Sequence, residues 1–154
     1  MDKLILDLNA IKDYQQNREP YLMIDEATEV LPGISAKGYK DLTKSEWFFK
    51  VHWPNDPNMP GMLQTEALIQ MSALIVQTMP GNKGKILYLV DADKLKFIKK
   101  IVPGDKLEIY SKLVSWKRGL IKFDAEGFVN SKKTCKASFT LVIPGSFDIK
   151  IKKF

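Results

Sequence analysis

The chain has 154 residues, a net charge of +6 and a single cysteine. Its composition, 45% hydrophobic and 27% charged, is typical of a globular protein, and we expect one domain over residues 1–154. One cysteine excludes an internal disulfide, and no apolar run approaches the ~18 residues that cross a bilayer. Asp2 and Asp7, with no cleavage site nearby, argue against a secretory signal. We therefore expect a cytoplasmic protein without a membrane span.

The N-terminal part of the chain predicts a short helix followed by a β-hairpin. Asn9 is suited to cap a helix that continues to Gln16. After Pro20, a strand over residues 21–31 ends at a Pro-Gly turn. A second strand over residues 34–41 completes the hairpin.

The next segment is a stiff loop that carries the only histidine, His52. Pro54, Pro57 and Pro60 restrict its backbone, and Gly61 frees the backbone where a helix begins. An imidazole on a shaped loop can act as a base near neutral pH. Taken alone, a histidine such as His52 is more often a packed or surface residue than a catalyst.

A helix over residues 60–79 follows and stops at a Pro-Gly pair. Apolar residues occupy every side of it, which is typical of a buried helix, and Glu66 is its one charged residue. A buried carboxyl group either pairs with a cation or has a raised pKa. A neutral carboxylic acid is what a general acid requires, so Glu66 is a candidate catalyst beside His52.

The rest of the chain predicts antiparallel strands. Cys135 falls on the core side of an alternating strand, where we expect it to be inert packing. A polar hairpin turn is expected at residues 130–133, and residues 147–154 receive no assignment. Long strands with one buried helix predict an α+β architecture. The expected strands are residues 85–98, 105–117, 120–129 and 134–143.

One motif of the chain resembles the signature of the hot-dog-fold 3-hydroxyacyl-[acyl-carrier-protein] dehydratases of fatty acid synthesis. It consists of His52, Pro60-Gly61, Glu66 and Gln70 at the spacing that this family has. Two more blocks, residues 18–25 and 94–105, resemble the same family, so that the likeness extends from about residue 11 to 143. This resemblance implies a hot-dog fold, in which a long antiparallel sheet wraps around one buried central helix.

The resemblance also implies a reaction, the dehydration of a 3-hydroxyacyl thioester to the trans-2-enoyl thioester in fatty acid synthesis or a related specialised acyl or polyketide pathway. His52 would take the C2 proton and Glu66 would protonate the leaving hydroxyl. Backbone N–H groups at Gly61 and Met62 would hold an oxyanion, and Gln70 would bond to Glu66 and help to bind substrate. We expect no metal, because one histidine and one cysteine make no ligand cluster, and no cofactor, because the thioester itself acidifies C2.

The chain departs from the family at several positions. Val51 and Asn55 stand where the family has glycine; Val51 adds bulk beside the imidazole, and Asn55 tolerates a left-handed turn. Trp53 replaces the usual phenylalanine, and Asn17 and Glu19 replace a histidine and a tyrosine. Two alternatives therefore stay open, a hot-dog thioesterase and a non-catalytic acyl-binding subunit.

The positive charge favours an acidic partner, and no motif for nucleic acid accompanies it. The resemblance implies an acyl carrier protein with an acyl-phosphopantetheine substrate. Lys94, Lys96 and Lys100 are the candidate docking residues, on the expectation that they share one strand face. The resemblance further implies a homodimer or a hexamer built as a trimer of dimers, in which His52 and Glu66 of one site come from different subunits.

Overall fold

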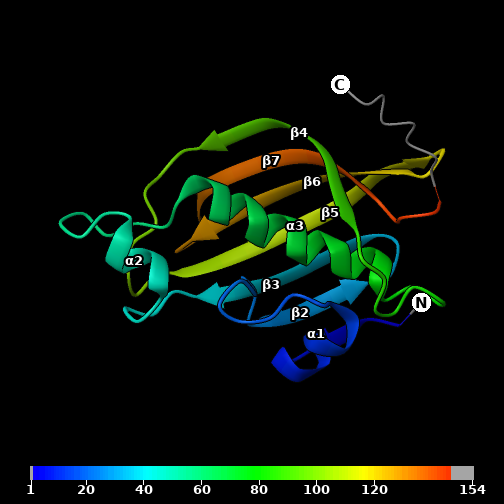
Figure 1. Cartoon of the computed structure of the whole chain (residues 1–154), viewed down its shortest axis with the longest axis horizontal. Helices are drawn as coiled ribbons and strands as arrows, with labels where there is room; N and C mark the ends of the chain where they lie inside the picture. Colours follow the sequence, from blue (N-terminus) through cyan, green and yellow to red (C-terminus); the bar gives the residue numbers. More distant parts are fainter. Residues whose placement is uncertain (1, 147–154) are drawn as a thin grey trace.

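A seven-stranded antiparallel sheet curves around one long helix in the computed structural model, which describes residues 2–146 (Figure 1). The strands lie in the order β1-β2-β3-β5-β6-β7-β4. This is the α+β, hot-dog architecture that the sequence predicted. The helices are α1 (Leu8–Tyr14), α2 (Trp47–Val51) and α3 (Gly61–Gln77). The strands are β1 (Leu4–Leu6), β2 (Glu26–Leu31), β3 (Ser35–Asp41), β4 (Tyr88–Phe97), β5 (Lys106–Lys117), β6 (Leu120–Val129) and β7 (Lys132–Val142).

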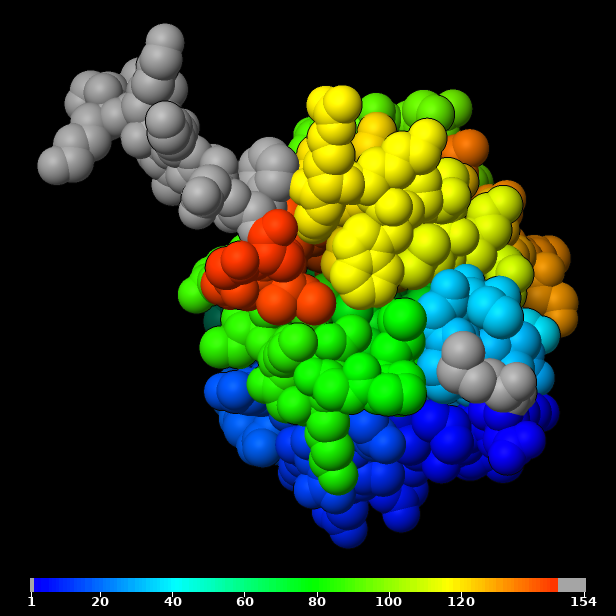
Figure 2. Space-filling view, turned by 90° about the vertical axis from the view of Figure 1, so that its right-hand side faces the viewer, coloured from blue at the N-terminus to red at the C-terminus, as the bar shows by residue number. Residues whose placement is uncertain are grey.

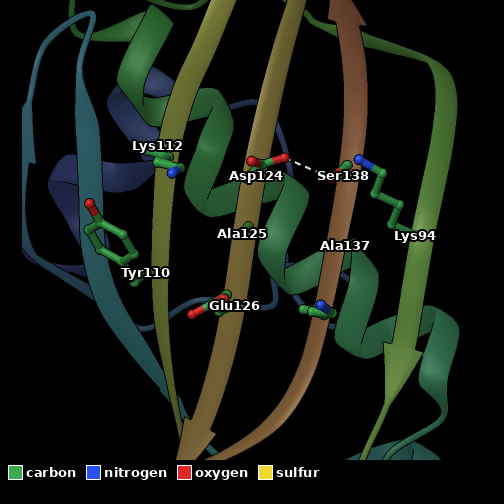
Figure 3. A pocket seen from close by; sticks show the side chains of 9 residues that line it. Lys94, Tyr110, Lys112, Asp124, Ala125, Glu126, Ala137 and Ser138 are labelled. Carbon is green, nitrogen blue, oxygen red and sulfur yellow. Dashed lines mark hydrogen bonds between the residues drawn. The ribbon is translucent and has the colours of Figure 1, made fainter.

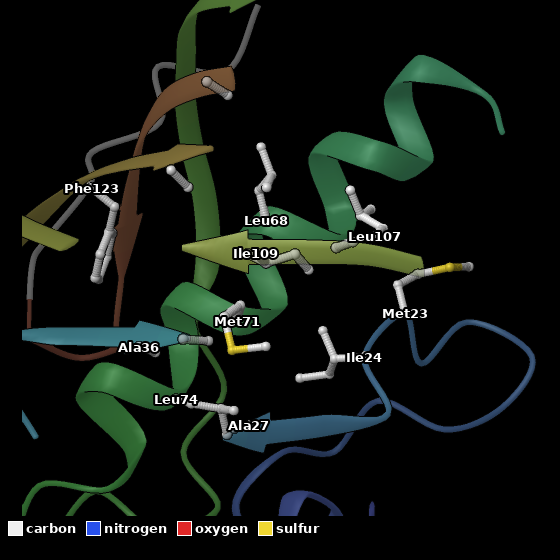
Figure 4. Packing of buried hydrophobic residues seen from close by; sticks show 14 of the residues in the cluster. Met23, Ile24, Ala27, Ala36, Leu68, Met71, Leu74, Leu107, Ile109 and Phe123 are labelled. Atoms are coloured by element: carbon white, nitrogen blue, oxygen red, sulfur yellow. The ribbon is translucent and has the colours of Figure 1, made fainter. Parts of the chain in front are cut away.

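Helix α3 forms the centre of the core, as its apolar sequence predicted. Met71 and Leu74 are fully buried and point toward the strands, where they join one cluster with Ala27, Ala36 and Ile109 (Figure 4). Burying a side chain of leucine size contributes about 1.5–3 kcal/mol, so this cluster fixes the helix firmly on the sheet. The core therefore fixes the position of the α3 backbone that carries the candidate site residues.

The structure corrects three local predictions in the N-terminal half. Asp7, not Asn9, caps α1, because its carboxylate accepts a hydrogen bond from the Ala10 N–H at 2.8 Å. The strand expected from residue 21 begins only at Glu26. Residues 47–51, which the sequence analysis did not assign to a helix, form α2. The described chain ends at residue 146, so the unassigned segment 147–154 lies outside the structure's description.

The late start of β2 has a clear physical cause in α3. The Met23 N–H donates to Gln70 Oε1 at 2.7 Å, and the Tyr21 carbonyl accepts from Gln70 Nε2 at 2.8 Å. A helix side chain thus satisfies backbone groups that a strand would have used for its ladder. The segment between α1 and β2 is consequently attached to the middle of α3.

Strand β4 lies at one edge of the sheet, paired on one side with β7 (Figure 1). It is shorter than predicted, and a bulge interrupts its ladder between Asp93 and Lys96, where Lys94 has a positive φ of 52°. Large apolar side chains along this edge are exposed: Ile86, Tyr88, Leu89, Val90, Phe97 and Ile98. None of the helices within residues 2–146 has the length and apolar character needed to cross a membrane.

Candidate active site

His52 is held at the junction of α2 and a loop of fixed shape. It is the C-cap residue of α2, and its N–H donates to the Phe48 carbonyl at 2.8 Å. Its own carbonyl accepts from the Asn58 N–H at 3.1 Å, and the Met59 N–H donates to the Ile101 carbonyl at 2.8 Å. The loop is therefore anchored at both ends, and the imidazole is half-buried.

One backbone contact determines the tautomer of His52. Its Nδ1 lies 3.2 Å from the carbonyl oxygen of Asn58. A carbonyl oxygen can only accept a hydrogen bond, so Nδ1 must carry the proton. The neutral ring then has its lone pair on Nε2, which is the form that a general base needs.

Glu66 lies in the second turn of α3 and is half-buried. Burial raises the pKa of its carboxyl group, while a hydrogen bond that Gln70 Nε2 donates to Oε1 at 2.9 Å opposes the rise. The predicted bond between Gln70 and Glu66 is thus present. Because burial is the larger effect, the carboxyl group holds its proton to a higher pH than an ordinary glutamate.

Gln70 uses all of its hydrogen-bonding groups within the protein. Its Nε2 donates both to the Tyr21 carbonyl and to Glu66, and its Oε1 accepts from the Met23 N–H. The amide is 2% exposed. Its place in the site is therefore beside the carboxyl group of Glu66, whose orientation it fixes.

The first turn of α3 presents backbone donors. The N–H groups of Leu63 and Gln64 both donate to the Pro60 carbonyl at 3.0 Å, and within residues 2–146 no such acceptor faces those of Gly61 and Met62. Free N–H groups at a helix start can stabilise negative charge. A Cβ at position 61 would lie 3.0–3.1 Å from the Phe97 ring, so a larger residue there would require that ring to shift.

A cavity of about 320 Å³ extends along α3 from Glu66. Glu66, Ile69, Ala73 and Gln77 line one wall, and residues 85–89 line the opposite side. His52 is not among the residues that line this cavity. Within a single chain, the carboxyl group and the imidazole therefore do not face the same cavity.

Val51 and Asn55, which stand where the family has glycine, affect the backbone less than the sequence suggested. Val51 belongs to the last turn of α2 and is 63% exposed, so that most of its side chain faces solvent. Asn55 is not among the described residues with positive φ, and the left-handed turn expected there is absent. The loop reaches its shape without a glycine at either position.

The candidate docking lysines do not share one strand face as predicted. Lys94 extends over the outer face of the sheet toward Ser138, close to Asp124 (Figure 3). Lys96 is on β4 opposite Lys136, whereas Lys100 lies beyond the end of β4 and pairs with Asp56 at 2.7 Å. Lys94 and Lys96 thus form an outer-face group with Lys136 of β7. Lys100 lies apart from this group, in an ion pair at the His52 loop.

Other reactive groups offer no competing chemistry. Cys135 is buried, and burial raises the pKa of its thiol to about 11. Such a thiol stays protonated and packs as a small apolar side chain. Within residues 2–146, no three histidine, cysteine, aspartate or glutamate side chains come together as metal ligands would.

Comparison with known proteins identifies the chain. Fold and site define a hot-dog protein with a half-buried carboxyl group and a histidine on an anchored loop. The family model described as the FabA-like domain matches residues 16–138, and the chain belongs to this family.

Two relatives named 3-hydroxyacyl-[acyl-carrier-protein] dehydratase FabZ match nearly the whole chain. The protein of Alkaliphilus metalliredigens (strain QYMF) is 39% identical over 140 residues, which cover 90% of this chain and 95% of the relative. That of Clostridium botulinum (strain Okra / Type B1) is 41% identical over 138 residues, covering 90% and 96%.

Solved structures show the same fold at lower identity. The dehydratase heterocomplex ApeI:P from Xenorhabdus doucetiae matches with a TM-score of 0.75 and 12% identity, covering 87% of this chain and 90% of that one. A hypothetical thioesterase with coenzyme A from Streptococcus pneumoniae TIGR4 matches with a TM-score of 0.59 and 18% identity, covering 76% and 84%. At these identities the likeness is one of fold.

Replacing Glu66 with glutamine should stabilise the protein, and increasingly so as the pH rises. The native pKa lies above the unfolded value of ~4.3, so the wild type loses stability as the pH rises through the native pKa. The glutamine side chain would keep an acceptor for Gln70 and carry no charge. Thermal unfolding of the wild type and Glu66→Gln across acidic to alkaline pH measures this; a stability difference independent of pH would contradict the burial argument.

Proposed function

We propose that the protein dehydrates a 3-hydroxyacyl thioester on acyl carrier protein to the trans-2-enoyl thioester. The observation that carries this proposal is the half-buried carboxyl group of Glu66, whose pKa is raised on an otherwise uncharged helix. A structural carboxylate would be expected to pair with a cation, but Glu66 bonds to the neutral amide of Gln70. The relatives at 39–41% identity that bear the dehydratase name support the same reaction.

Each site residue has one role in this reaction. His52 Nε2 removes the proton from C2, and Glu66 gives its proton to the C3 hydroxyl, which leaves as water. The electrons of the C2–H bond form the new double bond as the C3–O bond breaks. The N–H groups of Gly61 and Met62 stabilise charge on the thioester oxygen while the enolate develops. Gln70 orients Glu66 and is a positioning residue.

Separate His52→Ala and Glu66→Gln variants should each lose about 10²-fold or more in turnover, because general acid–base groups contribute roughly 10²–10⁴. Enoyl absorbance follows dehydration, and a thiol reagent in the same assay detects hydrolysis. Lys122→Gln, on the exposed outer face of β6, is the matched control. Free thiol without enoyl product would indicate a thioesterase, and wild-type turnover in either variant would rule out the assigned mechanism.

We further propose that the active unit is a homodimer, alone or within a hexamer, in which His52 of one chain completes the site of Glu66 in the other. The separation of His52 from the Glu66 cavity within one chain supports a shared site. The exposed apolar side chains of β4 support pairing at that edge, because an unprotected apolar strand edge favours association.

Mixing the two inactive variants tests the shared site. In a twofold dimer, each mixed pair has one site with both residues intact, so equal mixing should restore about a quarter of wild-type activity. Each variant carries a different affinity tag, so that capture on both tags confirms subunit exchange. Mixed dimers without activity would place both residues of a site in one chain.

Carrier docking is proposed for the outer-face lysines Lys94 and Lys96, with Lys100 held at the His52 loop. Lys94 and Lys96 form no salt bridge with another of residues 2–146, and Lys136 lies opposite Lys96 on β7. This adds a third positive charge to the group.

We place the reaction in the cytoplasm, in fatty acid synthesis or a related acyl pathway.

Charge reversal at Lys94 and Lys96 should lower kcat/KM for carrier-linked substrate by about 2- to 5-fold per residue at low salt, because exposed charge pairs contribute under ~1 kcal/mol each. The effect should fade as salt is added, and a pantetheine-linked substrate should be unaffected. Lys3→Glu, an exposed position next to β1 at the opposite edge of the sheet, is the control. Equal losses on both substrates would assign these lysines to folding instead of docking.

A further inference from the structure

The cavity that begins at Glu66 is long and narrow. Its α3 wall follows one helix face through Glu66, Ile69, Ala73 and Gln77. The eleven residue steps from Glu66 to Gln77 correspond to about 16 Å along the helix axis. A volume of about 320 Å³ over that length suits a single extended chain. The carboxyl group lies near one end of this groove, and the amide of Gln77 lies near the other.

The far end of the groove is bounded by the segment that follows α3. Residues 85–89 line the groove, and the Gln77 Nε2 donates to the Lys85 carbonyl at 2.9 Å. Figure 2 views the molecule from this end: the residues after α3, in green, fill the surface between the β5–β6 hairpin and the N-terminal segment. A chain that enters beside Glu66 therefore meets Gln77 before it reaches this surface.

Gln77 has an unused acceptor at that point. Its side chain is 4% exposed, and its Oε1 accepts no hydrogen bond from any group within residues 2–146. The bond from Nε2 to the Lys85 carbonyl determines which end of the amide is the nitrogen. Leaving a buried acceptor unpaired costs about 1–3 kcal/mol. A plain alkyl chain in the groove would leave that cost in place, whereas a donor on the chain would remove it.

Gln70 provides the contrast on the same wall. It lines the same cavity two turns before Gln77 and is similarly buried. Its three hydrogen bonds to Tyr21, Met23 and Glu66 use the whole amide. Of these two buried glutamines along the groove, Gln77 is the one whose side-chain oxygen has no hydrogen-bond donor within residues 2–146.

We propose that the groove holds the acyl chain and that Gln77 selects chains with a hydrogen-bond donor, such as a hydroxyl group, about 16 Å from the reacting carbons. This inference rests on the proposed function and names the substrate class for that site. A site with a buried polar group discriminates strongly against an analogue that lacks the partner, because the group is then left unpaired. The selected substrate is a long acyl thioester oxygenated near its far end.

Binding tests this selection independently of the chemistry. The ligands are saturated acyl-pantetheine thioesters of increasing chain length, each prepared with a terminal methyl and a terminal hydroxyl group, and calorimetry gives their affinities for the wild-type protein. At one chain length, the hydroxylated ligand should bind about tenfold tighter than its methyl partner. Shorter chains, which end before Gln77, should show no such preference. Equal affinities at every length would overturn the inference.

A variant pair assigns the preference to one residue. Gln77→Leu should abolish the preference for the hydroxylated chain and bind the methyl chain at least as well as the wild type. Gln16→Leu is the control, because Gln16 lines the same cavity with an exposed side chain. A hydroxyl preference that survives Gln77→Leu would also overturn the assignment. If Gln77→Leu does not fold, the wild-type comparison decides alone.

The two proposals fail separately in this design. A hydroxyl preference without dehydration of any 3-hydroxyacyl thioester would overturn the proposed function and leave the groove selection intact. Dehydration with equal binding of hydroxylated and plain chains would retain the function and remove the role of Gln77.

Discussion

The candidate site depends on one carboxyl group that is placed in an apolar helix and forms no salt bridge with any cation within residues 2–146. Glu66 sits on α3, whose other side chains are uncharged and whose core face is fixed by the sheet. Its neighbour Gln70 supplies a neutral donor and uses its remaining hydrogen bonds on the backbone at Tyr21 and Met23. The same contacts that hold the acid in place also shape the segment before β2. The side-chain amide of Gln70 therefore connects the candidate acid, Glu66, to the backbone of the segment before β2.

The second constraint is that His52 does not line the cavity of Glu66 within one chain. The imidazole of His52 is prepared by its bond to the Asn58 carbonyl, yet the cavity of Glu66 is lined without it. Beside that cavity runs β4, the sheet edge with exposed apolar side chains. A partner chain that covers this edge would both bury the apolar surface and bring an imidazole toward the acid, so assembly and catalysis would share one surface.

Sequence patterns predicted the parts of the molecule that burial dictates. The long run without charge located α3, and alternation located β5, β6 and β7 within a few residues. The patterns failed where tertiary hydrogen bonds decide the backbone, as at Met23, which bonds to Gln70 instead of a strand. The spacing of the His52 motif predicted that His52 and Glu66 act as a pair, and that pairing stays a prediction. The Asn58 carbonyl and the unpaired oxygen of Gln77 were not, because linear sequence does not show which buried polar groups find partners.

The central claim is that the raised pKa of Glu66 keeps its carboxyl group protonated, so that it can act as the acid. Carbon-13 NMR of the Glu66 carboxyl carbon, assigned by comparison with Glu66→Gln, measures its pKa directly in the assembled protein. The account predicts a midpoint clearly above the ~4.3 of an ordinary glutamate. A midpoint at or below that value would leave the carboxylate ionised at neutral pH and would contradict its role as the proton donor.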